Sequence, residues 1–364
     1  MPTLSDVAKI AGVGVMSVSR VVNGSRKVSP DIESKVRAAL KKIGYEPNEA
    51  ARILKGHRAR VIGVIVPDLS NPFFANCVNE IQCTFREAGY ISWMAASNHR
   101  EEIERQDIQT MVQRKVAGLL VVPSGFQIDH FSQARRSGIP IVAFDRPITS
   151  VEADTLTVDN RAAAARATQH LIDHCHRHIV CVRRTDDDKL YTRTERIAGY
   201  SEVMDAAKYP VRFCYVPGDL NEPFNNQLES VMNSVPVPTA IFAVDNVVAV
   251  DVLRALQRLS IKVPEQVALI AFDDFDAATL MRPTITAVRQ PVAQIGRDAA
   301  ALLLARIDGD NQLPSRPIHT VLPTELVIRE SCGCTHQGAS MNHKPTRQKR
   351  DRETRQSYVN SVTA

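Results

Sequence analysis

The feature that most constrains the fold of this 364-residue chain is a series of short, wholly apolar runs. They are hydrophobic at consecutive positions, as in strands that are buried on both faces of a parallel sheet. Stretches long enough for a helix separate the runs, so the pattern predicts an α/β fold with two doubly wound lobes. The runs cover residues 61–67, 91–96, 117–123, 139–144, 179–182, 239–244 and 267–272, and a further strand is expected at 155–158.

Acidic side chains follow five of the predicted strands, at Pro67-Asp68, Asp145-Arg146, Asp159-Asn160, Asp245-Asn246 and Asp273-Asp274. Ligands of open α/β sheets bind at the carboxyl ends of the strands. Together these side chains predict a cleft for a polyhydroxylated ligand, with Arg146 and Arg196 as donors and Phe73 and Phe74 as apolar platforms. For any single aspartate, the alternative is an ordinary helix cap or turn residue.

Positive charge is concentrated near the N-terminus. Up to Arg60 the chain has 12 Lys and Arg against 5 Asp and Glu, whereas the remaining 304 residues have 33 against 35. A small basic module joined to a mildly acidic body is typical of a nucleic-acid-binding protein that has a second function.

Local signals divide this basic segment into three short helices. Thr3 can cap the first helix, with Asp6 as its acidic partner three positions on, and Gly12 allows a tight turn afterwards. The second helix covers about residues 15–22 and ends at Asn23-Gly24. Its inward-facing residues are expected to be Val18, Val21 and Val22.

The third helix is predicted to begin at Ser29-Pro30, where a capping hydroxyl precedes a proline at the first helical position. Lys41 and Lys42 in its last turn, followed by Gly44, are typical of a helix C-terminus.

Two helices joined at Gly12 have the arrangement that places the second helix in the major groove of DNA. The residues that would reach DNA are Val15, Met16, Ser17 and Arg20. The alternative is a solvated three-helix bundle with an ordinary basic surface.

The segment at 48–55 has a helical pattern but is too short to be a stable helix alone in water. It precedes the first predicted strand, so it is also the natural linker. These two properties predict a linker that folds on DNA.

The N-terminal segment also resembles the lactose-repressor/galactose-repressor (LacI/GalR) family of bacterial transcription regulators, and the resemblance continues to about Glu330. The residues that carry it are Thr3, Asp6, Val7, Ala8, Ala11-Gly12-Val13, Val18-Ser19-Arg20-Val21, Asn23, Val28-Ser29, Gly44-Tyr45, Pro47-Asn48, Ala51-Arg52 and Leu54.

This resemblance implies a helix-turn-helix headpiece at 1–46, a hinge helix or linker at 47–60, and an effector-binding and dimerisation core at 61–330. The core would be two-lobed and periplasmic-binding-protein-like. Leu54 would be a minor-groove wedge, one from each subunit, that kinks the operator. The DNA-binding residues are expected to be Thr3, Val15, Met16, Ser17, Arg20, Asn23, Asn48, Ala51, Arg52, Leu54 and Lys55.

The resemblance also identifies effector contacts. Residues 192–200 resemble the family's T-x-x-x-R-x-x-G-[YF] pattern, and Phe272-Asp273-Asp274 resembles its G-[FY]-D-D strand end. The expected effector-binding residues are Phe73, Phe74, Asp145, Arg146, Asp159, Thr192, Arg196, Asp245 and Asp273.

Some positions depart from the family's pattern. Gly14 replaces a usual serine, which weakens the cap of the second helix, and neither Val15 nor Met16 can form a bidentate hydrogen bond with a base. The order Asp245-Asn246 is inverted, and Leu220 stands where several members have an aromatic ring. The operator sequence and the effector therefore stay open.

Histidines at 170, 174, 176 and 178, with Cys175, look like metal ligands, but this family commonly has Gly-His in this helix-to-strand turn. No metal site and no cofactor are therefore expected. Cys332 and Cys334 have no second pair and are interpreted as free thiols in the tail. No P-loop, nucleophile elbow or complete catalytic triad motif is present, so the chain is not expected to be an enzyme.

Seven cysteines without a secretory leader fit the reducing cytoplasm, and no stretch is long and apolar enough to span a membrane. The segment 331–364 is expected to be a disordered basic tail. Altogether the sequence predicts a cytoplasmic, homodimeric repressor that binds pseudo-palindromic operator DNA. Its control is expected to come from a small polar effector, a sugar or sugar derivative. The alternatives are a sugar-binding protein without a DNA role and a sugar-processing enzyme on the same scaffold.

Overall fold

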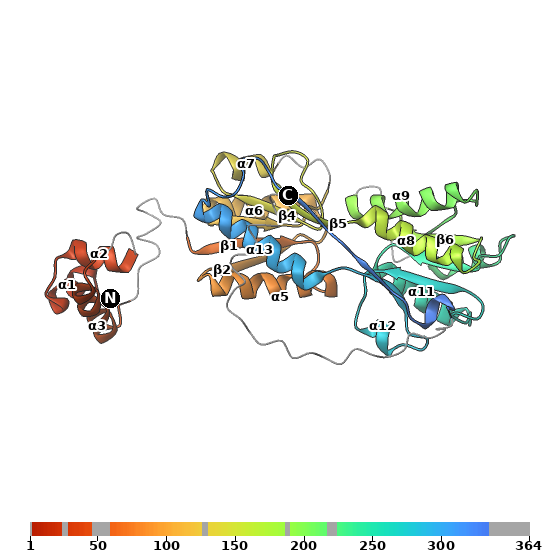
Figure 1. Ribbon diagram of the computed structural model, residues 1–364, viewed down its shortest axis with the longest axis horizontal. Helices are drawn as coiled ribbons and strands as arrows, with labels where there is room; N and C mark the ends of the chain where they lie inside the picture. Colours follow the sequence, from red (N-terminus) through yellow and green to blue (C-terminus); the bar gives the residue numbers. More distant parts are fainter. Residues whose placement is uncertain are drawn as a thin grey trace.

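The computed structural model describes residues 2–23, 28–45, 59–125, 130–185, 190–216 and 224–334. Within these ranges the chain forms an N-terminal three-helix headpiece and two α/β lobes (Figure 1). The expectations for the hinge residues up to 58, for Leu220 and for the tail from residue 335 concern positions outside the described part of the chain. None of the described helices is long and apolar enough to cross a membrane.

The headpiece consists of α1 (Leu4–Ala11), α2 (Val15–Asn23) and α3 (Pro30–Ile43). The predicted capping box is present, because the backbone of Asp6 donates to Thr3 Oγ1 and the backbone of Thr3 donates to Asp6 Oδ2. Gly12 and Gly44 end α1 and α3 in the left-handed conformation, as expected. The fully buried side chains of Val7, Val18 and Val36 form the core.

One headpiece prediction is wrong. Ser29 does precede α3, and Pro30 is at the first helical position, but the Ser29 side chain makes no capping hydrogen bond. The proline has a fixed φ that suits the first helical position, so it favours the start of α3 without this bond.

The N-terminal lobe contains a six-stranded parallel sheet in the order β11-β5-β4-β3-β1-β2. Its strands are β1 (Val61–Val66), β2 (Ile91–Ala96), β3 (Gly118–Val121), β4 (Ile141–Phe144), β5 (Asp154–Val158) and β11 (His319–Leu322). Its helices are α5 (Pro72–Glu87), α6 (Glu101–Gln113), α7 (Phe131–Arg136) and α13 (Val292–Asp308).

The C-terminal lobe repeats this design in the order β12-β10-β9-β8-β6-β7, with only β12 antiparallel. Its strands are β6 (Ile179–Arg184), β7 (Phe213–Val216), β8 (Ala240–Ala243), β9 (Ala268–Phe272), β10 (Thr286–Arg289) and β12 (Glu325–Val327). Its helices are α8 (Asn160–Asp173), α9 (Tyr191–Ala206), α10 (Phe224–Met232), α11 (Asn246–Arg258), α12 (Ala277–Leu280) and the 3₁₀ turn η2 (Glu330–Cys332).

The chain crosses between the lobes three times, after β5, after β10 and after β11. As a result α8 packs on α9 in the C-terminal lobe, whereas α13 packs on α5 in the N-terminal lobe (Figure 1). Glycine permits both helix contacts. A Cβ on Gly199 would lie 2.1 Å from the carbonyl oxygen of Arg161, and one on Gly296 would lie 2.6 Å from that of Cys77.

Every apolar run predicted to be a strand is one, but β7, β10, β11 and β12 were not predicted. Three of these four lie at sheet edges, and in β11 and β12 exposed polar residues interrupt the apolar pattern. The edge strand β2 is also less buried than expected, since Ile91 is 69% exposed. The lobe extends beyond the expected boundary at 330, because Ser331 and Cys332 are buried in it.

Candidate functional site

A cavity of about 420 Å³ lies where the carboxyl ends of the two sheets face each other. Residues of both lobes line its walls. Eight of the nine predicted effector-binding residues line it: Phe73, Phe74, Asp145, Arg146, Thr192, Arg196, Asp245 and Asp273. A wider depression of about 830 Å³ lies around Arg135 and Arg306. Those two arginines already form ion pairs with Glu152 and Asp154, so the cavity between the lobes is the better candidate site.

Arg196 is the most firmly held residue of this cavity. It projects from α9 and is only 3% exposed. Its Nε donates to Asn160 Oδ1 at 2.8 Å, and its Nη1 donates to the Val244 carbonyl at 2.9 Å. Nη1 also lies 3.4 Å from Asp273 Oδ2, and the guanidinium carbon lies 3.6 Å from the centre of the Phe272 ring. The guanidinium group of Arg196 is therefore fixed in place before any ligand binds.

Two buried aspartates occupy equivalent places in the lobes. Asp145 follows β4 and Asp273 follows β9, and both have a positive φ, 65° and 68°. Such a conformation is uncommon for a residue other than glycine and is found preferentially at functional sites. Burial raises the pKa of both carboxyls above the ordinary value of an aspartate, because the charged form loses its hydration.

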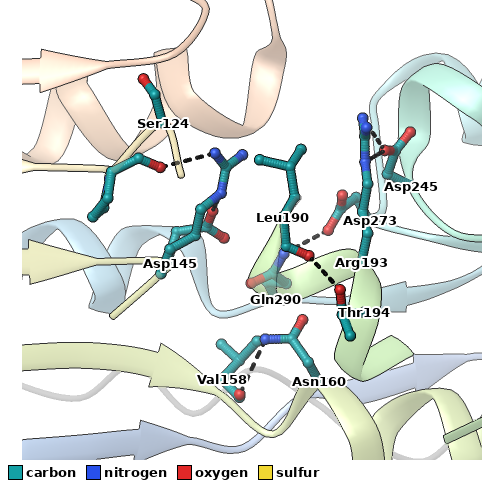
Figure 2. A network of polar contacts seen from close by, with 12 residues as sticks. Ser124, Asp145, Val158, Asn160, Leu190, Arg193, Thr194, Asp245, Asp273 and Gln290 are labelled. Carbon is teal, nitrogen blue, oxygen red and sulfur yellow. Dashed lines mark hydrogen bonds and ion pairs between the residues drawn. The ribbon is translucent and has the colours of Figure 1, made fainter. Parts of the chain in front are cut away.

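Two buried polar atoms of the cavity make no hydrogen bond among the described residues: Gln290 Oε1, and Arg146 Nε, which lies 3.2 Å from Asp145 Oδ2 in an ion pair but without hydrogen-bond geometry. Each of the two side chains makes a hydrogen bond through another nitrogen atom. Arg146 Nη1 donates to the Pro123 carbonyl at 3.1 Å. Gln290 Nε2 donates to Asp273 Oδ1 at 2.5 Å (Figure 2). A buried donor and a buried acceptor that make no hydrogen bond favour a ligand that supplies both bonds.

Asp245 both caps a helix and lines the cavity. It accepts from the backbone of Val248 at 2.8 Å, and its other oxygen pairs with Arg193 at 2.7 Å (Figure 2). Burial opposes the charge of Asp245. Even so, Arg193, the Val248 N–H and Arg196 hold the pKa of this carboxyl below its ordinary value.

Amide side chains connect the lobes beside the cavity. Asn71 precedes α5 in one lobe and Asn246 begins α11 in the other. Asn246 Nδ2 donates to Asn71 Oδ1 at 3.0 Å, and Asn71 Nδ2 lies 3.4 Å from Asn246 Oδ1. This reciprocal pair depends on the orientation of the lobes.

The headpiece presents the side chains that were predicted to read DNA. On α2, Val15 is 47% exposed and Met16 is 71% exposed, and Arg20 is also exposed. Ser17 is half-buried, and Asn23 is the last residue of the helix. Thr3 is exposed at the start of α1. The other expected DNA contacts, Asn48, Ala51, Arg52, Leu54 and Lys55, lie outside the described residues.

Comparison with known proteins identifies the chain. Residues 3–48 match the model for bacterial regulatory proteins of the lacI family, and residues 168–332 match that for a periplasmic binding protein-like domain. The chain is 33% identical to the HTH-type transcriptional regulator CelR of Thermobifida fusca, over 91% of this chain and 98% of that protein. The chain belongs to the LacI family. It is a DNA-binding transcription regulator.

Other relatives of this LacI-family regulator agree. Catabolite control protein A of Priestia megaterium is 30% identical over 86% of this chain and 97% of its own length. A solved structure of a CelR–cellobiose complex has a TM-score of 0.64 at 29% identity and covers 91% of this chain and 100% of that chain. The lac repressor dimer bound to operator and the anti-inducer ONPF has a TM-score of 0.75 over 91% and 99% of the two chains. At 21% identity it supports the fold alone.

The ninth expected effector contact, Asp159, does not line the cavity of this regulator. It pairs with Arg166 at 2.8 Å and accepts from the Thr324 backbone at 3.0 Å, beside the crossing from β11 to β12. Its place at the end of β5 suggested a ligand contact, but the neighbouring Asn160 is the residue that reaches Arg196. The expectation for Asp159 is thus not supported.

The motif at 192–200 has two roles in this LacI-family fold. Thr192 and Arg196 line the cavity, whereas Gly199 permits the close contact of α9 with α8. Tyr200 is fully buried, and its hydroxyl donates to the Ile179 carbonyl at 2.8 Å. Of these four motif residues, Thr192 and Arg196 are therefore available to a ligand, whereas Gly199 and Tyr200 serve the packing of the lobe.

Several lining residues were missed by sequence reasoning. Arg193 lies one turn before Arg196 and could have been found from helical spacing. Asn71 stands beside a predicted strand end, whereas Asn246, in the pair Asp245-Asn246, was already expected at the cleft. Gln290 had no such signal, because it follows the unpredicted strand β10.

Proposed function

We propose that this LacI-family regulator is an effector-controlled repressor, in which a small polar molecule bound between the lobes changes the affinity of a homodimer for operator DNA. The observation that carries the proposal is the cavity itself. Buried donors and acceptors from both lobes converge on it, and Arg146 Nε and Gln290 Oε1 have no hydrogen-bond partner within the described chain.

The chemistry of the walls favours a neutral, hydroxyl-rich ligand. Four arginines and five acidic residues line the cavity, so there is no surplus of positive charge for a phosphate or a nucleotide. Guanidinium groups, which donate hydrogen bonds, lie beside carboxylates, which accept them. This combination suits the paired hydroxyls of a sugar. Phe73 and Phe74, packed edge to face at 5.1 Å, provide an apolar wall. The cellobiose complex of CelR supports the same ligand class.

The position of the cavity supplies a mechanism of control. Since the ligand would contact both lobes, it stabilises one relative orientation of them over others. A change of orientation alters the positions of the hinge segments that enter from the headpieces. Effector and DNA affinities are then reciprocally coupled, typically by about 1–3 kcal/mol, or about 5–150-fold in DNA affinity.

On DNA, the proposal requires two inverted half-sites read by two copies of α2. Arg20 would contact phosphate and Arg52 the minor groove, and Leu54 would act as the wedge at the operator centre. Leu54→Ala should weaken operator binding sharply and reduce bending. Unchanged affinity and bending in this variant would contradict the hinge assignment.

The assembly is proposed to be a homodimer, because a two-fold operator matches a two-fold protein. Residues 331–364 contain no leucine, so this segment does not provide a leucine-heptad tetramerisation helix. Light scattering should give a dimer in the full chain and after deletion of 335–364. A tetramer that survives this deletion would require another interface.

The alternatives make different predictions. A sugar-binding protein without a DNA role would not retain specific DNA at physiological salt. A sugar-processing enzyme would consume the sugar, whereas we infer that this regulator binds it unchanged and without a cofactor.

The decisive experiment is to sequence the genomic fragments that the full-length protein retains, and then to titrate the best fragment by fluorescence anisotropy. A panel of mono- and disaccharides that includes cellobiose is added to the complex. We expect one class of sugar to shift DNA affinity by about 5–150-fold. Specific DNA binding that no sugar or other polar metabolite alters would overturn effector control, and absence of specific binding would overturn the repressor assignment.

A further inference from the structure

A cluster of histidine and cysteine side chains lies in the C-terminal lobe, away from the effector cavity. His170 and His174 are one turn apart at the end of α8, and Cys334 comes from the last described segment of the chain. His170 Nε2 lies 3.1 Å from Cys334 Sγ. One ligand atom of each of the three residues lies within 4.8 Å of the others.

The sequence analysis treated these groups separately, as a helix-to-strand turn and as free thiols in the tail. Part of that interpretation is confirmed. Cys175 has a φ of 68°, as expected at a position where the family has glycine, and His176 bonds to Thr239 at 3.0 Å. The structure nevertheless places Cys334 beside the two other histidines, although 160 residues separate it from His174.

The tautomer of His174 is determined by its surroundings. Its Nδ1 lies 2.7 Å from the His170 carbonyl oxygen, which can only accept a hydrogen bond. Nδ1 is therefore the donor of this hydrogen bond, which leaves Nε2 as the nitrogen available to a metal ion. A backbone carbonyl that fixes the other nitrogen in this way is the usual outer partner of a metal-binding histidine.

The segment that carries Cys334 is held in place independently. Ser331 and Cys332 are buried, and Ser331 Oγ donates to the Leu269 carbonyl at 2.7 Å. Cys332 Sγ donates to the Arg329 carbonyl at 3.3 Å. Cys334 is thus presented to α8 by an ordered turn, which lowers the entropic cost of bringing the ligands together.

We propose that His170, His174 and Cys334 bind a zinc ion that joins the end of α8 to the C-terminal segment. Two imidazoles and a thiolate are donors that zinc prefers, and the group has no carboxylate that would favour calcium or magnesium. Zinc–ligand bonds of about 2.0–2.3 Å place tetrahedral ligand atoms about 3.3–3.6 Å apart. The three side chains therefore need only small rotations, and water can occupy the fourth position.

This site is independent of the proposed effector. Asn160, at the cavity end of α8, is ten residues from His170, which corresponds to about 15 Å along the helix. Zinc should consequently stabilise the C-terminal lobe without competing with a sugar.

The test uses the full-length, reduced protein after removal of metals with a chelator. Titration with Co²⁺ should give a cysteine-to-cobalt charge-transfer band that saturates at one equivalent per chain, and Zn²⁺ should displace it. His174→Asn and Cys334→Ser should each weaken zinc binding by more than about 100-fold, since loss of an outer partner alone costs about 10–100-fold. His174 is exposed, so its replacement should not prevent folding.

Cys175→Ser is the matched control, because Cys175 is an exposed thiol next to His174 that is not in the cluster. It should retain the cobalt band and the wild-type zinc affinity. The proposal is overturned if wild-type protein gives no sulfur band at one equivalent. It is equally overturned if the band persists in Cys334→Ser or disappears in Cys175→Ser.

Discussion

The two lobes of this regulator share one topology but prepare their sides of the cavity differently. Each has six strands in the same order, and each places a buried aspartate with positive φ after its fourth strand. In the C-terminal lobe, Asp273 is held by Arg196 and Gln290. In the N-terminal lobe, Asp145 has Arg146 beside it, whose Nε makes no hydrogen bond within the described residues.

The residue after each aspartate shows the same difference. Arg146 lines the cavity, whereas Asp274 pairs with Arg329 and Arg289 outside it. In the C-terminal lobe the donors and acceptors around Asp273 are therefore mostly paired, and only Gln290 Oε1 makes no hydrogen bond among the described residues, while in the N-terminal lobe Arg146 Nε makes none. A ligand that bonds to both atoms gains most when both lobes close on it, which is what a switch between the lobes requires.

The largest expected effect is that of Arg196→Ala. Loss of this guanidinium leaves Asp273 buried without its cation and also removes bonds to Asn160 and the Val244 carbonyl. The free energy of unfolding should fall by about 3–5 kcal/mol. Arg146→Ala removes the ion pair with buried Asp145 and the bond to the Pro123 carbonyl. It should nevertheless cost less, about 1–3 kcal/mol, because the charge of Arg196 still acts on Asp145. Urea denaturation measures both.

Both arginine variants should lose most of the effector response while retaining operator affinity. If Arg196→Ala and Arg146→Ala lowered the free energy of unfolding equally, the inferred difference between the two lobes would be contradicted. A wild-type effector midpoint in both variants would mean that the ligand does not bind here.

The helix contacts of the two lobes can be compared at Gly199 and Gly296. Alanine at 199 would bring its Cβ to 2.1 Å from a backbone oxygen, against 2.6 Å at 296. Since overpacking costs about 1–3 kcal/mol, we expect Gly199→Ala near the upper end of this range and Gly296→Ala lower. Thermal unfolding in parallel would show this order, and the reverse order would contradict the packing argument.

Effector affinity should depend on pH through Asp145 and Asp273. Burial raises the pKa of both carboxyls above 3.8, so they accept protons at a higher pH than ordinary aspartates. The affinity for the sugar should be highest above these pKa values, where both carboxylates are charged. It should fall as the pH decreases through the pKa values, by up to about tenfold per pH unit for each group. Asp245 should not contribute, because its pKa is lowered.

Isothermal titration with the identified sugar between about pH 8 and about pH 4 would measure this dependence. Asp273→Asn should remove one of the transitions. A constant affinity over the whole range would show that neither carboxylate accepts a hydrogen bond from the ligand.

The smallest effect is expected for Asp159→Asn. The Asp159 carboxylate lies outside the cavity, and its partner Arg166 is about half exposed. Loss of such a pair costs about 0–1 kcal/mol, and the effector midpoint should not change. A clear shift of that midpoint would place the ligand closer to β5 than the structure indicates.

The sequence alone predicted much of the fold for a local reason. A strand buried on both faces must be apolar at consecutive positions, so β1 and β9 are visible as runs of residues. Helix ends likewise need particular residues nearby, as at Thr3 and Gly12. Edge strands such as β12 have no such pattern, because solvent accepts polar side chains on them.

The cavity was predicted in part for the same reason, since Asp145 and Asp273 stand directly after recognisable strands. Asp159 stands after one as well, and nothing in its neighbours distinguishes it from the other two. Only the path of the chain across the lobes turns Asp159 toward Thr324 and Asn160 toward Arg196.

The sequence by itself determined the two-lobed class, the headpiece and the family. The tertiary structure decided which polar residues meet: Asn71 with Asn246 across the lobes, and His170 with Cys334 at the end of α8. The physical reason is that burial and turn chemistry act within a few residues and leave local patterns. A contact between residues more than 150 positions apart depends on how whole elements pack, and no local pattern records it.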